Sequence, residues 1–408
     1  MSTKTTYKQT ELGLIPEDWE VKKLGDLVNI KSGDSPTKFK LSESNGKYPY
    51  LKVEDLNNCN KYQSLSRNYS NDKFSIVKEN SIIFPKRGAA ILNNKVRINI
   101  IPVQMDSNLM ALTVKNEKSN VEFLYYKITK EGLFKIADTS TIPQINNKHI
   151  LPYKIPLPPL PEQKKIANCL STWDVAIEKQ NALINALTDR KKALMQQLLT
   201  GKKRLPGFSG EWKEVKLGDL FEKINRKNEE GNTNVVTISA QRGFVKQTDF
   251  FNKSVASETL DNYSLIYHGE FCYNKSYSNG YPLGATKRLI AFEKAVVTTL
   301  YICFKIKDQK KSNGSFFEQF FEANSLDRSL IKIAQEGGRA HGLLNVSLSD
   351  FFNIKIKLPP IEEQTAIAEI LAAADRELQL QKEKLAQLQA QKKGLMQVLL
   401  TGKKRLIN

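Results

Sequence analysis

The sequence predicts an α+β protein in which two mixed globular domains are joined by a long antiparallel two-helix coiled coil, with an internal pseudo-two-fold repeat. Three observations predict this fold. The chain has 408 residues, which is too long for one ordinary domain. Residues 157–205 and 358–406 align without a gap and are identical at 24 of 49 positions. In both segments apolar residues recur at alternating spacings of four and three, as in a coiled-coil seam.

The repeat divides the chain into four parts. We expect globular domains and helical segments, in alternation, at residues 1–156, 157–205, 206–357 and 358–408. The globular parts share Trp19 and the LGDL of residues 24–27, which recur as Trp212 and the LGDL of 217–220, but little else. One face of the molecule therefore stayed constant after duplication, while two others diverged.

Each globular part shows short β-rich runs separated by Asn, Gly, Pro and Ser, followed late by helical periodicity. We expect strands at 81–84, 96–103, 109–114, 235–239, 270–273 and 298–306, and helices at 121–137 and 316–334. These patterns predict a mixed α+β domain of roughly 150 residues in each copy.

The repeated segments carry the clearest pattern. The first seam consists of Ile166, Leu170, Trp173, Ile177, Gln180, Ile184, Leu187, Lys191, Leu194 and Leu198. The second consists of Ile367, Leu371, Ala374, Leu378, Gln381, Leu385, Leu388, Lys392, Leu395 and Leu399. Pro161 suits a first helical turn, and Gly201 and Gly402 suit the position just after a helix. Each helix then spans about 40 residues, roughly 60 Å at ~1.5 Å per residue.

The direction of pairing follows from the duplication. Narrow apolar stripes need a partner, and two copies related by a two-fold axis would pair antiparallel. Gln180 and Gln381 lie near the middle of their helices, so they could face each other and exchange a hydrogen bond that fixes register. The alternative is that both side chains extend to solvent.

The composition favours a polyanionic partner. The formal net charge is +19, from 62 Lys and Arg against 43 Asp and Glu, and both halves of the chain are basic. Nucleic acid is the leading candidate, and basicity for solubility alone is the alternative. No apolar run approaches the ~20 residues that span a bilayer, so we expect a cytoplasmic protein without a membrane partner. Scattered Cys and His predict neither a disulfide framework nor a metal site.

Several motifs resemble those of a known family. LPPLPEQ at 157–163, LPPIEEQ at 358–364 and the shared helix ending LLTGKKRL are similar to the conserved regions of specificity subunits of type I restriction-modification systems. LGLIPEDWEVKKLGDL at 12–27 and LPGFSGEWKEVKLGDL at 205–220 resemble the start of their target recognition domains. The resemblance covers nearly the whole chain in the family's order.

Two positions depart from the repeated pattern. Glu362 replaces the proline found at Pro161, and Gly394 lies in the second helix where the first has Ala193. The glycine is expected to cost about 1 kcal/mol of helix stability. The docking of a partner on this part of the helix is therefore open.

The resemblance implies a non-catalytic subunit for DNA sequence recognition. Each target recognition domain would read one half of an asymmetric bipartite site in double-stranded DNA, and the helices would set the spacing and dock two methyltransferase subunits, to which endonuclease/translocase subunits add. No cofactor is expected on this chain, and S-adenosylmethionine, ATP and Mg would be used by the partner subunits. Consistent with this, the sequence has no dinucleotide fingerprint, Walker A loop or amino-methyltransferase motif.

Polar loop residues are the candidates for DNA contact, because Lys and Arg bind phosphates while Arg, Asn, Gln and Ser read base edges. In the first domain we favour Ser35, Thr37, Lys38, Lys86 and Arg87. In the second we favour Gln241, Arg242, Lys275, Ser276, Tyr277, Asn279 and Arg288. We expect the half-site centres to lie about one helical turn apart, on the order of 34 Å.

Three questions stay open at this stage. The GKKR of 201–204 and 402–405 could contact phosphate or complement the helix dipole, and we favour the dipole. The chain could serve a methyltransferase-only or type II-like assembly. It could also be a coiled-coil scaffold whose basic charge is incidental.

Overall fold

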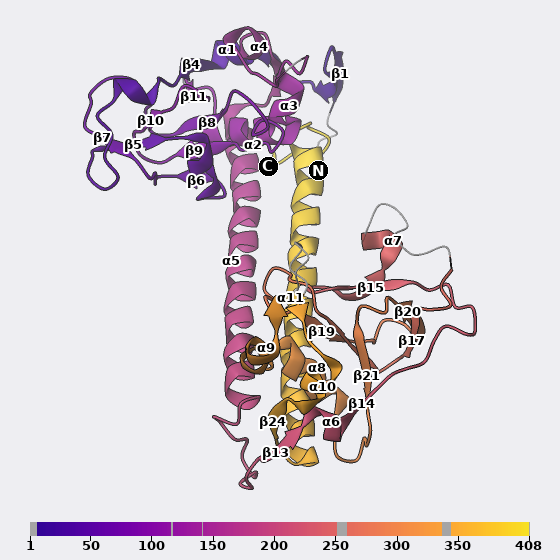
Figure 1. The fold of residues 1–408 in the computed structure, drawn as a ribbon. Coiled ribbons are helices and arrows are strands. Elements are labelled where there is room, and N and C mark those ends of the chain that lie inside the picture. Colours follow the sequence, from indigo (N-terminus) through magenta and orange to yellow (C-terminus); the bar gives the residue numbers. More distant parts are fainter. Residues whose placement is uncertain (1–5, 116, 141, 251–258, 337–343, 408) are drawn as a thin grey trace. The chain divides into compact units, whose positions relative to one another are not determined.

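The computed structural model describes residues 6–115, 117–140, 142–250, 259–336 and 344–407. The chain forms two compact units. Unit 1 comprises residues 1–181 and 384–408, and unit 2 comprises residues 182–383. Each unit therefore contains one globular head and a segment of both long helices, and both chain ends belong to unit 1 (Figure 1).

Two helices of 39 residues each, α5 (Leu160–Leu198) and α11 (Ile361–Leu399), form the helical parts. In unit 1, Asp174 near the start of α5 pairs with Lys392 near the end of α11. In unit 2, Lys191 near the end of α5 pairs with Asp375 near the start of α11. The helix segments thus run antiparallel in both units, as the sequence predicted, and α11 continues unbroken through Gly394.

The predicted seam is the least exposed stripe of both helices. Its apolar members Ile166, Leu170, Ile367 and Leu371 are at most 1% exposed. The other seam positions, including Trp173, are buried or half-buried, and none is exposed. Gln180 is buried and Gln381 half-buried. Because these two glutamines belong to different units, the hydrogen bond between them stays a prediction.

The helix ends follow the predicted signals. Gly201 and Gly402, just after α5 and α11, have φ of 69° and 72°, the left-handed conformation that favours glycine. At the other end, the Gln163 amide nitrogen donates to the Pro158 carbonyl (2.8 Å), and Gln364 donates to Pro359 (2.9 Å) in the same way. The repeated PPxxEQ motif therefore fixes how the chain enters each helix.

The head of unit 1 is built on a five-stranded sheet in the order β4-β11-β8-β9-β6, with a three-stranded sheet β10-β5-β7 beside it. Its strands are β1 (Tyr7–Thr10), β2 (Gly13–Pro16), β3 (Glu20–Lys23), β4 (Val28–Ser32), β5 (Tyr48–Leu51), β6 (Tyr62–Gln63), β7 (Tyr69–Ser70), β8 (Ser81–Pro85), β9 (Arg97–Asn99), β10 (Gln104–Met105), β11 (Leu109–Val114) and β12 (Lys154–Leu157). Its helices are α1 (Leu24–Leu27), η1 (Pro36–Lys38), η2 (Val53–Asn57), α2 (Val121–Glu131), α3 (Leu133–Ile136) and α4 (Asn147–Ile150).

The head of unit 2 is built on a four-stranded sheet in the order β14-β21-β18-β19. Its strands are β13 (Lys213–Lys216), β14 (Phe221–Lys223), β15 (Val236–Ser239), β16 (Gly243–Lys246), β17 (Ser264–Tyr267), β18 (Phe271–Asn274), β19 (Ala285–Arg288), β20 (Lys294–Val297), β21 (Ile302–Ile306), β22 (Gln335–Glu336), β23 (Leu344–Asn345) and β24 (Lys355–Leu358). Its helices are α6 (Leu217–Leu220), α7 (Gln247–Phe250), α8 (Gly314–Glu322), α9 (Asp327–Ile333) and α10 (Leu348–Asn353).

The two heads share one architecture despite their faint sequence similarity. The order β4-β11-β8-β9 in unit 1 corresponds to β14-β21-β18-β19 in unit 2, and β3 pairs with β12 as β13 pairs with β24. In each unit one hydrophobic core joins the head to the helices, so that Trp19 packs with Leu170 and Leu399 in unit 1, and Phe317 packs with Leu371 in unit 2. The duplication therefore extends through the heads.

The predicted elements are largely present, with differences in their limits. The strand expected at 298–306 begins only at Ile302. The expected strand at 96–103 is shorter, because Arg97–Asn99 forms β9, Val103 makes only an isolated bridge to Val77, and β10 begins after it. The helix expected at 121–137 breaks at Gly132 (φ 83°), which separates α2 from α3. The helix expected at 316–334 divides into α8 and α9 around Asn324, which also has a positive φ of 54°. Among the described residues no helix is long and apolar enough to cross a membrane.

Candidate nucleic-acid interface

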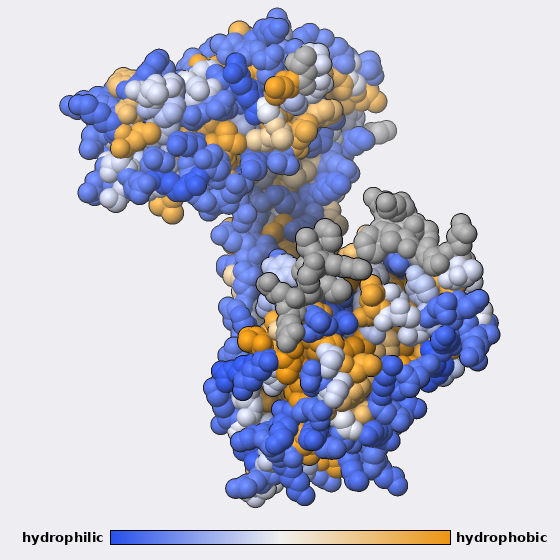
Figure 2. Space-filling view, viewed as in Figure 1, coloured by the Kyte–Doolittle hydropathy of each residue, from blue (hydrophilic) through white to orange (hydrophobic). Residues whose placement is uncertain are grey.

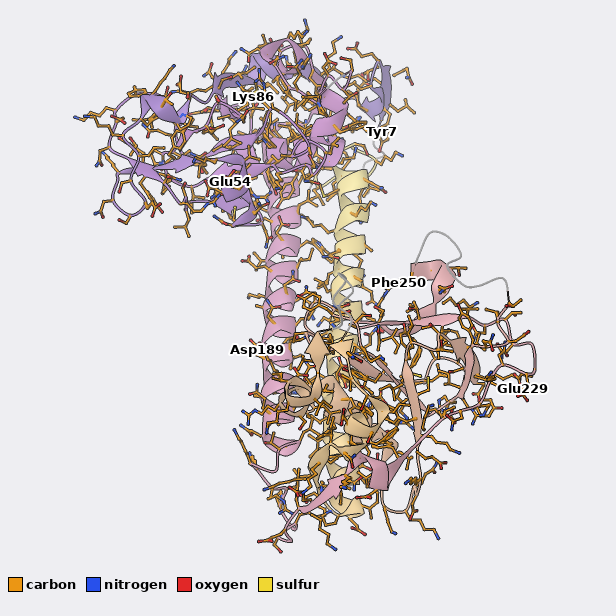
Figure 3. All side chains as sticks on the ribbon, viewed as in Figure 1. Tyr7, Glu54, Lys86, Asp189, Glu229 and Phe250 are labelled. Atoms are coloured by element: carbon orange, nitrogen blue, oxygen red, sulfur yellow. The ribbon has the colours of Figure 1, made fainter. Side chains whose placement is uncertain are left out.

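The two candidate loops of the first head lie at the same end of its sheet. One follows β4, where the Asp34 backbone N–H donates to the Met105 carbonyl (2.9 Å). The other follows β8, where the Lys86 N–H donates to the Asn108 carbonyl (2.8 Å). Both loops are therefore held by the turn that leads from β10 to β11. Figure 3 labels Lys86 in this head, and Figure 2 shows mainly hydrophilic side chains on the visible face of unit 1.

The loop after β4 is internally bonded. Ser35 begins the short helix η1, and its hydroxyl forms a hydrogen bond with that of Thr37 (2.8 Å). The exposed Lys38 pairs with Asp34 (2.7 Å). Hydrogen bonds from Lys38 and Ser75 hold the pKa of Asp34 below its usual range. To bind a phosphate, Lys38 would therefore have to give up its ion pair with Asp34.

The cationic groups of the loop after β8 form no ion pairs in the described residues. Lys86 is half-buried, and this burial, reinforced by the neighbouring charge of Arg87, lowers its pKa. Arg87 is exposed, and in the described part of the chain its guanidinium has neither a hydrogen bond nor an ion pair. A guanidinium with five donors and no partner in the described residues suits a guanine edge or a phosphate.

In the second head, the structure brings two of the candidate loops together. Gln241 and Arg242 form the turn between β15 and β16, and the Gln241 amide nitrogen donates to the carbonyl of Asn279 (2.9 Å). Asn279 belongs to the loop after β18, whose tip exposes Tyr277 (64%). The exposed Arg242 lies with its guanidinium 5.9 Å from the ring centroid of Phe250, which Figure 3 labels on α7.

The remaining residues of this loop have local roles. The Lys275 carbonyl accepts from the Leu344 N–H (3.1 Å), so this loop is paired with β23. The Ser276 N–H donates to the side chain of Asn274 (3.1 Å), which fixes the start of the loop. Lys275 and Ser276 are both half-buried. Their side chains therefore lie below the exposed tip of the loop.

Arg288 differs from the other candidates because its guanidinium is already engaged. It donates to Ser315 (3.3 Å) and to the Gly269 carbonyl (3.3 Å), and it lies 3.6 Å from Glu318 on α8. Burial raises the pKa of Glu318, although Arg288 opposes that shift. Arg288 also lines a cavity of about 300 Å³ together with Gln241 and Arg242. Arg288 thus lies beside the exposed loops, and its guanidinium is bonded to α8 and to the Gly269 carbonyl.

Sequence reasoning missed a pair of clamps at the helix ends. In unit 1, both carboxylate oxygens of Glu162 accept from Arg405 (2.7 Å each), and Trp19 donates its indole N–H to the same carboxylate (2.9 Å). In unit 2, Glu363 accepts from Arg204 (2.7 Å each) and from Trp212 (3.1 Å). The bond to Glu162 raises the pKa of Arg405, and the bond to Glu363 raises that of Arg204.

These clamps account for the arginine of the repeated GKKR. Each arginine binds a carboxylate in the first turn of the other long helix, a partner that sequence reasoning did not foresee. The lysines of both copies are exposed. The signal was present in the sequence, because the Trp, Glu and Arg of each clamp all recur in both copies.

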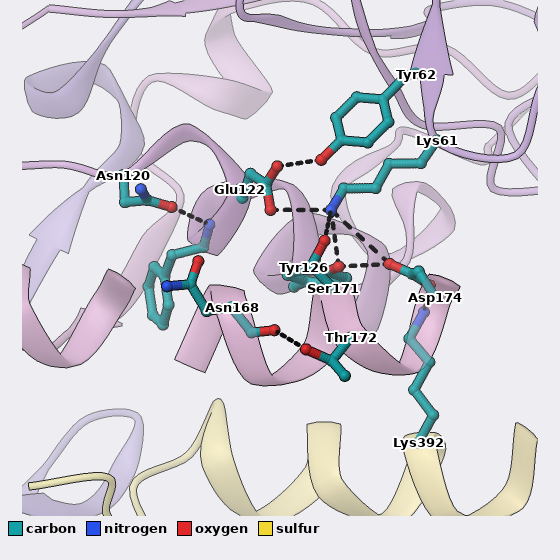
Figure 4. A network of polar contacts seen from close by, with 11 residues as sticks. Lys61, Tyr62, Asn120, Glu122, Tyr126, Asn168, Ser171, Thr172, Asp174 and Lys392 are labelled. Carbon is teal, nitrogen blue, oxygen red and sulfur yellow. Dashed lines mark hydrogen bonds and ion pairs between the residues drawn. The ribbon is translucent and has the colours of Figure 1, made fainter. Parts of the chain in front are cut away.

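A second unforeseen cluster ties the first head to α5 (Figure 4). The Lys61 ammonium is 6% exposed and contacts Glu122 (3.0 Å), the Tyr126 hydroxyl (2.8 Å) and Ser171 (3.3 Å). Asp174 lies 3.8 Å from the same ammonium and also accepts from Tyr126 and Lys392. The buried charge of Lys61 is therefore surrounded by two carboxylates and two hydroxyls.

The cysteines and acidic residues give no sign of a metal centre in the parts of the chain that are described. All four cysteines are free thiols. Cys272 and Cys303, distant in sequence, are opposite each other on β18 and β21, with 3.1 Å between their sulfurs. Burial raises the pKa of Cys272, which keeps this thiol protonated.

Each α+β head is followed by a long helix, and the heads carry exposed polar loops. This duplicated arrangement is typical of a two-headed recognition protein. The model of the type I restriction modification DNA specificity domain matches the chain twice, over residues 16–189 and 209–390. The chain therefore belongs to this family: it is a specificity subunit of a type I restriction-modification system, and it is non-catalytic.

Individual proteins show the same similarity over nearly the full length. The type I restriction enzyme MjaVIII specificity subunit of Methanocaldococcus jannaschii is 28% identical over 97% of this chain and 95% of its own. The S subunit of the type I restriction-modification system from M. genitalium has a TM-score of 0.53 at 16% identity, over 93% of this chain and 96% of its own. A structure that describes complex assembly and conformational transition of the type I R-M system has a TM-score of 0.56 at 14% sequence identity. The match covers 96% of this chain and 99% of that chain.

Proposed function

We propose that each head of this specificity subunit reads one half of an asymmetric, two-part DNA sequence. In this proposal the target recognition domains are residues 1–156 and 206–357, and the helical parts are 157–205 and 358–408. The helices set the spacing between the half-sites and dock two methyltransferase subunits, which endonuclease/translocase subunits join. The partners, and not this chain, use S-adenosylmethionine, ATP and Mg.

One observation carries the proposal: the heads share a scaffold but differ in the loops that it presents. Lys86 and Arg87 follow β8, and Lys275, Ser276 and Tyr277 follow the equivalent strand β18. The same sheet order supports both loops. Two readers with different side chains at equivalent positions are suited to two different short sequences.

The candidate residues divide by chemistry. Arg87 and Arg242 are exposed guanidinium groups suited to guanine, and Asn279 is an exposed amide suited to adenine. Lys38, Lys86 and Lys275 are assigned to phosphates, which set the register on the duplex. Gln241 supports the loop of Asn279 through its amide nitrogen. Ser35, Thr37 and Ser276 shape their loops, Tyr277 offers its exposed ring, and Arg288 supports the second reading surface from below.

The spacing part of the proposal follows from helix length. Each long helix has 39 residues, or about 58 Å at ~1.5 Å per residue, and part of it packs against its own head. We propose half-site centres about one helical turn apart, on the order of 34 Å along the duplex.

The test compares Arg87→Ala and Arg242→Ala in the complex with the methyltransferase subunits. Each variant is expected to weaken binding to its own half-site by about 1–3 kcal/mol, without affecting the other half-site. The readout is binding to a library of randomised DNA sites at several salt concentrations, because phosphate contacts produce a steep salt dependence. Arg328→Ala, which removes an exposed arginine on α9, is the matched control.

Three outcomes would contradict the proposal. Unchanged affinity in both variants would exclude these loops as readers. A uniform loss for every DNA sequence would restrict them to phosphate contact. Binding by the unmodified complex without any sequence preference would favour a scaffold whose charge is incidental.

A further inference from the structure

We infer that Gln144 is a base-reading residue of the first recognition domain, in a row with Arg87; this inference rests on the proposed function. No pattern in the sequence points to Gln144, which lies far along the chain from the loop after β8. The structure brings the two together by backbone pairing.

The pairing is a small antiparallel ladder. The Ile145 N–H donates to the Lys86 carbonyl (2.9 Å), and the Gly88 N–H donates to the Pro143 carbonyl (2.9 Å). These two bonds flank the pair Arg87 and Gln144, which are direct cross-strand partners. Partners in such a narrow pair have Cα atoms about 4.5 Å apart and side chains on the same face. Gln144 therefore extends beside Arg87.

The ladder continues on the other side of Gln144. Asp138 and Gln144 exchange both backbone hydrogen bonds (2.9 Å each), so Asp138, Gln144 and Arg87 form one row. The face of this row is the outer one. Ile145, the next residue along the strand, is fully buried in the core, whereas Arg87 is exposed and Gln144 half-buried.

The three side chains differ in what they leave free. One oxygen of Asp138 accepts from the N–H (3.0 Å) and hydroxyl (2.7 Å) of Ser140, which closes the turn, so Asp138 is a positioning residue. The Gln144 amide has no hydrogen-bond partner in the described residues, and neither has the Arg87 guanidinium. The row thus presents a free amide next to a free guanidinium.

This combination matches the edges of two adjacent base pairs. A glutamine amide donates and accepts at once, which fits the N7 acceptor and N6 amino donor of adenine, while arginine fits guanine. The surrounding charge suits a duplex, because Lys86 lies next to Arg87. The pKa of Asp138 is lowered chiefly by its hydrogen bonds from Ser140, and the nearby His149 and Lys148 lower it further. The proposed ligand of Gln144 is therefore an adenine in the half-site that also contacts Arg87.

The experiment selects DNA sites from a randomised library with the complete methyltransferase complex, comparing the unmodified chain with Gln144→Ala and Gln144→Glu. Gln144→Ala is expected to lose the preference at one base pair of the first half-site, by about 5- to 140-fold. Gln144→Glu keeps the size of the side chain but can only accept, so it should shift that position from adenine towards cytosine. The second half-site should not change in either variant.

Gln9→Ala is the matched control, since Gln9 is an exposed glutamine on β1 of the same unit and should leave every preference unchanged. Selection of the original site by both Gln144 variants would overturn the inference, as would an equal loss at all positions. If Arg87→Ala alters its base pair while the Gln144 variants do not, the proposed function stands and this inference fails. If the unmodified complex selects no sequence, both fail together.

Discussion

In both units an equivalent Asp–Lys ion pair joins the two helices, but the head residues that bind to this pair differ. Asp174 pairs with Lys392 in unit 1, and Asp375 pairs with Lys191 in unit 2, at equivalent positions of the repeat. The head of unit 1 adds the Tyr126 hydroxyl to this pair and places the buried Lys61 beside it. Among its described residues, the head of unit 2 adds only the amide of Gln319, which donates to Asp375 (2.8 Å).

This difference separates what duplication preserved from what each head acquired. The Asp and Lys of this ion pair, and the Glu, Arg and Trp of the clamps at the helix ends, recur in both copies. The contacts from the heads are not, since one copy uses a buried lysine and tyrosine where the other uses a neutral amide. The helices therefore act as a constant frame, to which different heads are bonded in different ways.

The largest expected effect concerns the clamps, where the two units should behave alike. Glu162→Ala and Glu363→Ala each remove a buried carboxylate and leave an arginine without its bidentate partner. Each variant should lower the free energy of unfolding by about 3–5 kcal/mol, as is typical when one member of a buried ion pair is removed. Urea denaturation followed by circular dichroism measures the loss, and hydrogen exchange shows which unit opens.

Controls for the clamp variants come from the same helices. Glu178→Ala and Glu369→Ala remove exposed carboxylates of α5 and α11 and should change stability by less than about 0.5 kcal/mol. Arg405 also binds Asp18 (2.7 Å), a partner that Arg204 lacks in the described chain. A loss confined to only one of the two clamp variants would show that the frame is not equivalent in the two units.

The next effect should reveal the difference between the heads. Lys61→Met leaves Glu122 without its buried cation, whereas Gln319→Ala removes one hydrogen bond to Asp375. We expect the free energy of unfolding to fall by about 2–3 kcal/mol for Lys61→Met and by about 1 kcal/mol for Gln319→Ala. Hydrogen bonds to a charged group contribute more at a buried site than at an exposed one. The same denaturation measurement checks both. Equal losses would mean that the two attachments are energetically equivalent, contrary to the geometry.

The helical frame could be predicted because its information is local and present twice. Ile166, Leu170 and their counterparts recur at helical spacing, and the glycines and prolines at the helix ends have conformational reasons that need no knowledge of the fold. The strand at 109–114 was also predicted with its observed limits, since four apolar residues are followed there by the β-branched Thr113 and Val114. The sequence also predicted the order of domains and helices, through the repeat.

The contacts that complete the site could not be predicted because they join distant residues. Lys61 meets Ser171 from 110 positions away, and Cys272 meets Cys303 across two strands whose register no local pattern fixes. Basic residues also look alike in sequence whether free or paired. Only the structure separates Arg87, which has no ion pair in the described residues, from Arg288, which is bonded to α8.

The smallest expected effect is a pH dependence confined to the first head. Burial and the adjacent Arg87 lower the pKa of Lys86, so its ammonium loses its proton at a lower pH than an ordinary lysine. A bound phosphate would restore the proton, and binding must therefore take up a proton once the pH exceeds this lowered pKa. Affinity for the first half-site should fall as the pH rises towards the ordinary lysine range, and the slope of log affinity against log salt should decrease by about 1. Lys86→Arg should remove this dependence, because arginine stays protonated throughout, and titrations of both proteins with one DNA site between neutral and alkaline pH provide the measurement. A pH profile that is identical in the two proteins would place Lys86 away from the phosphates.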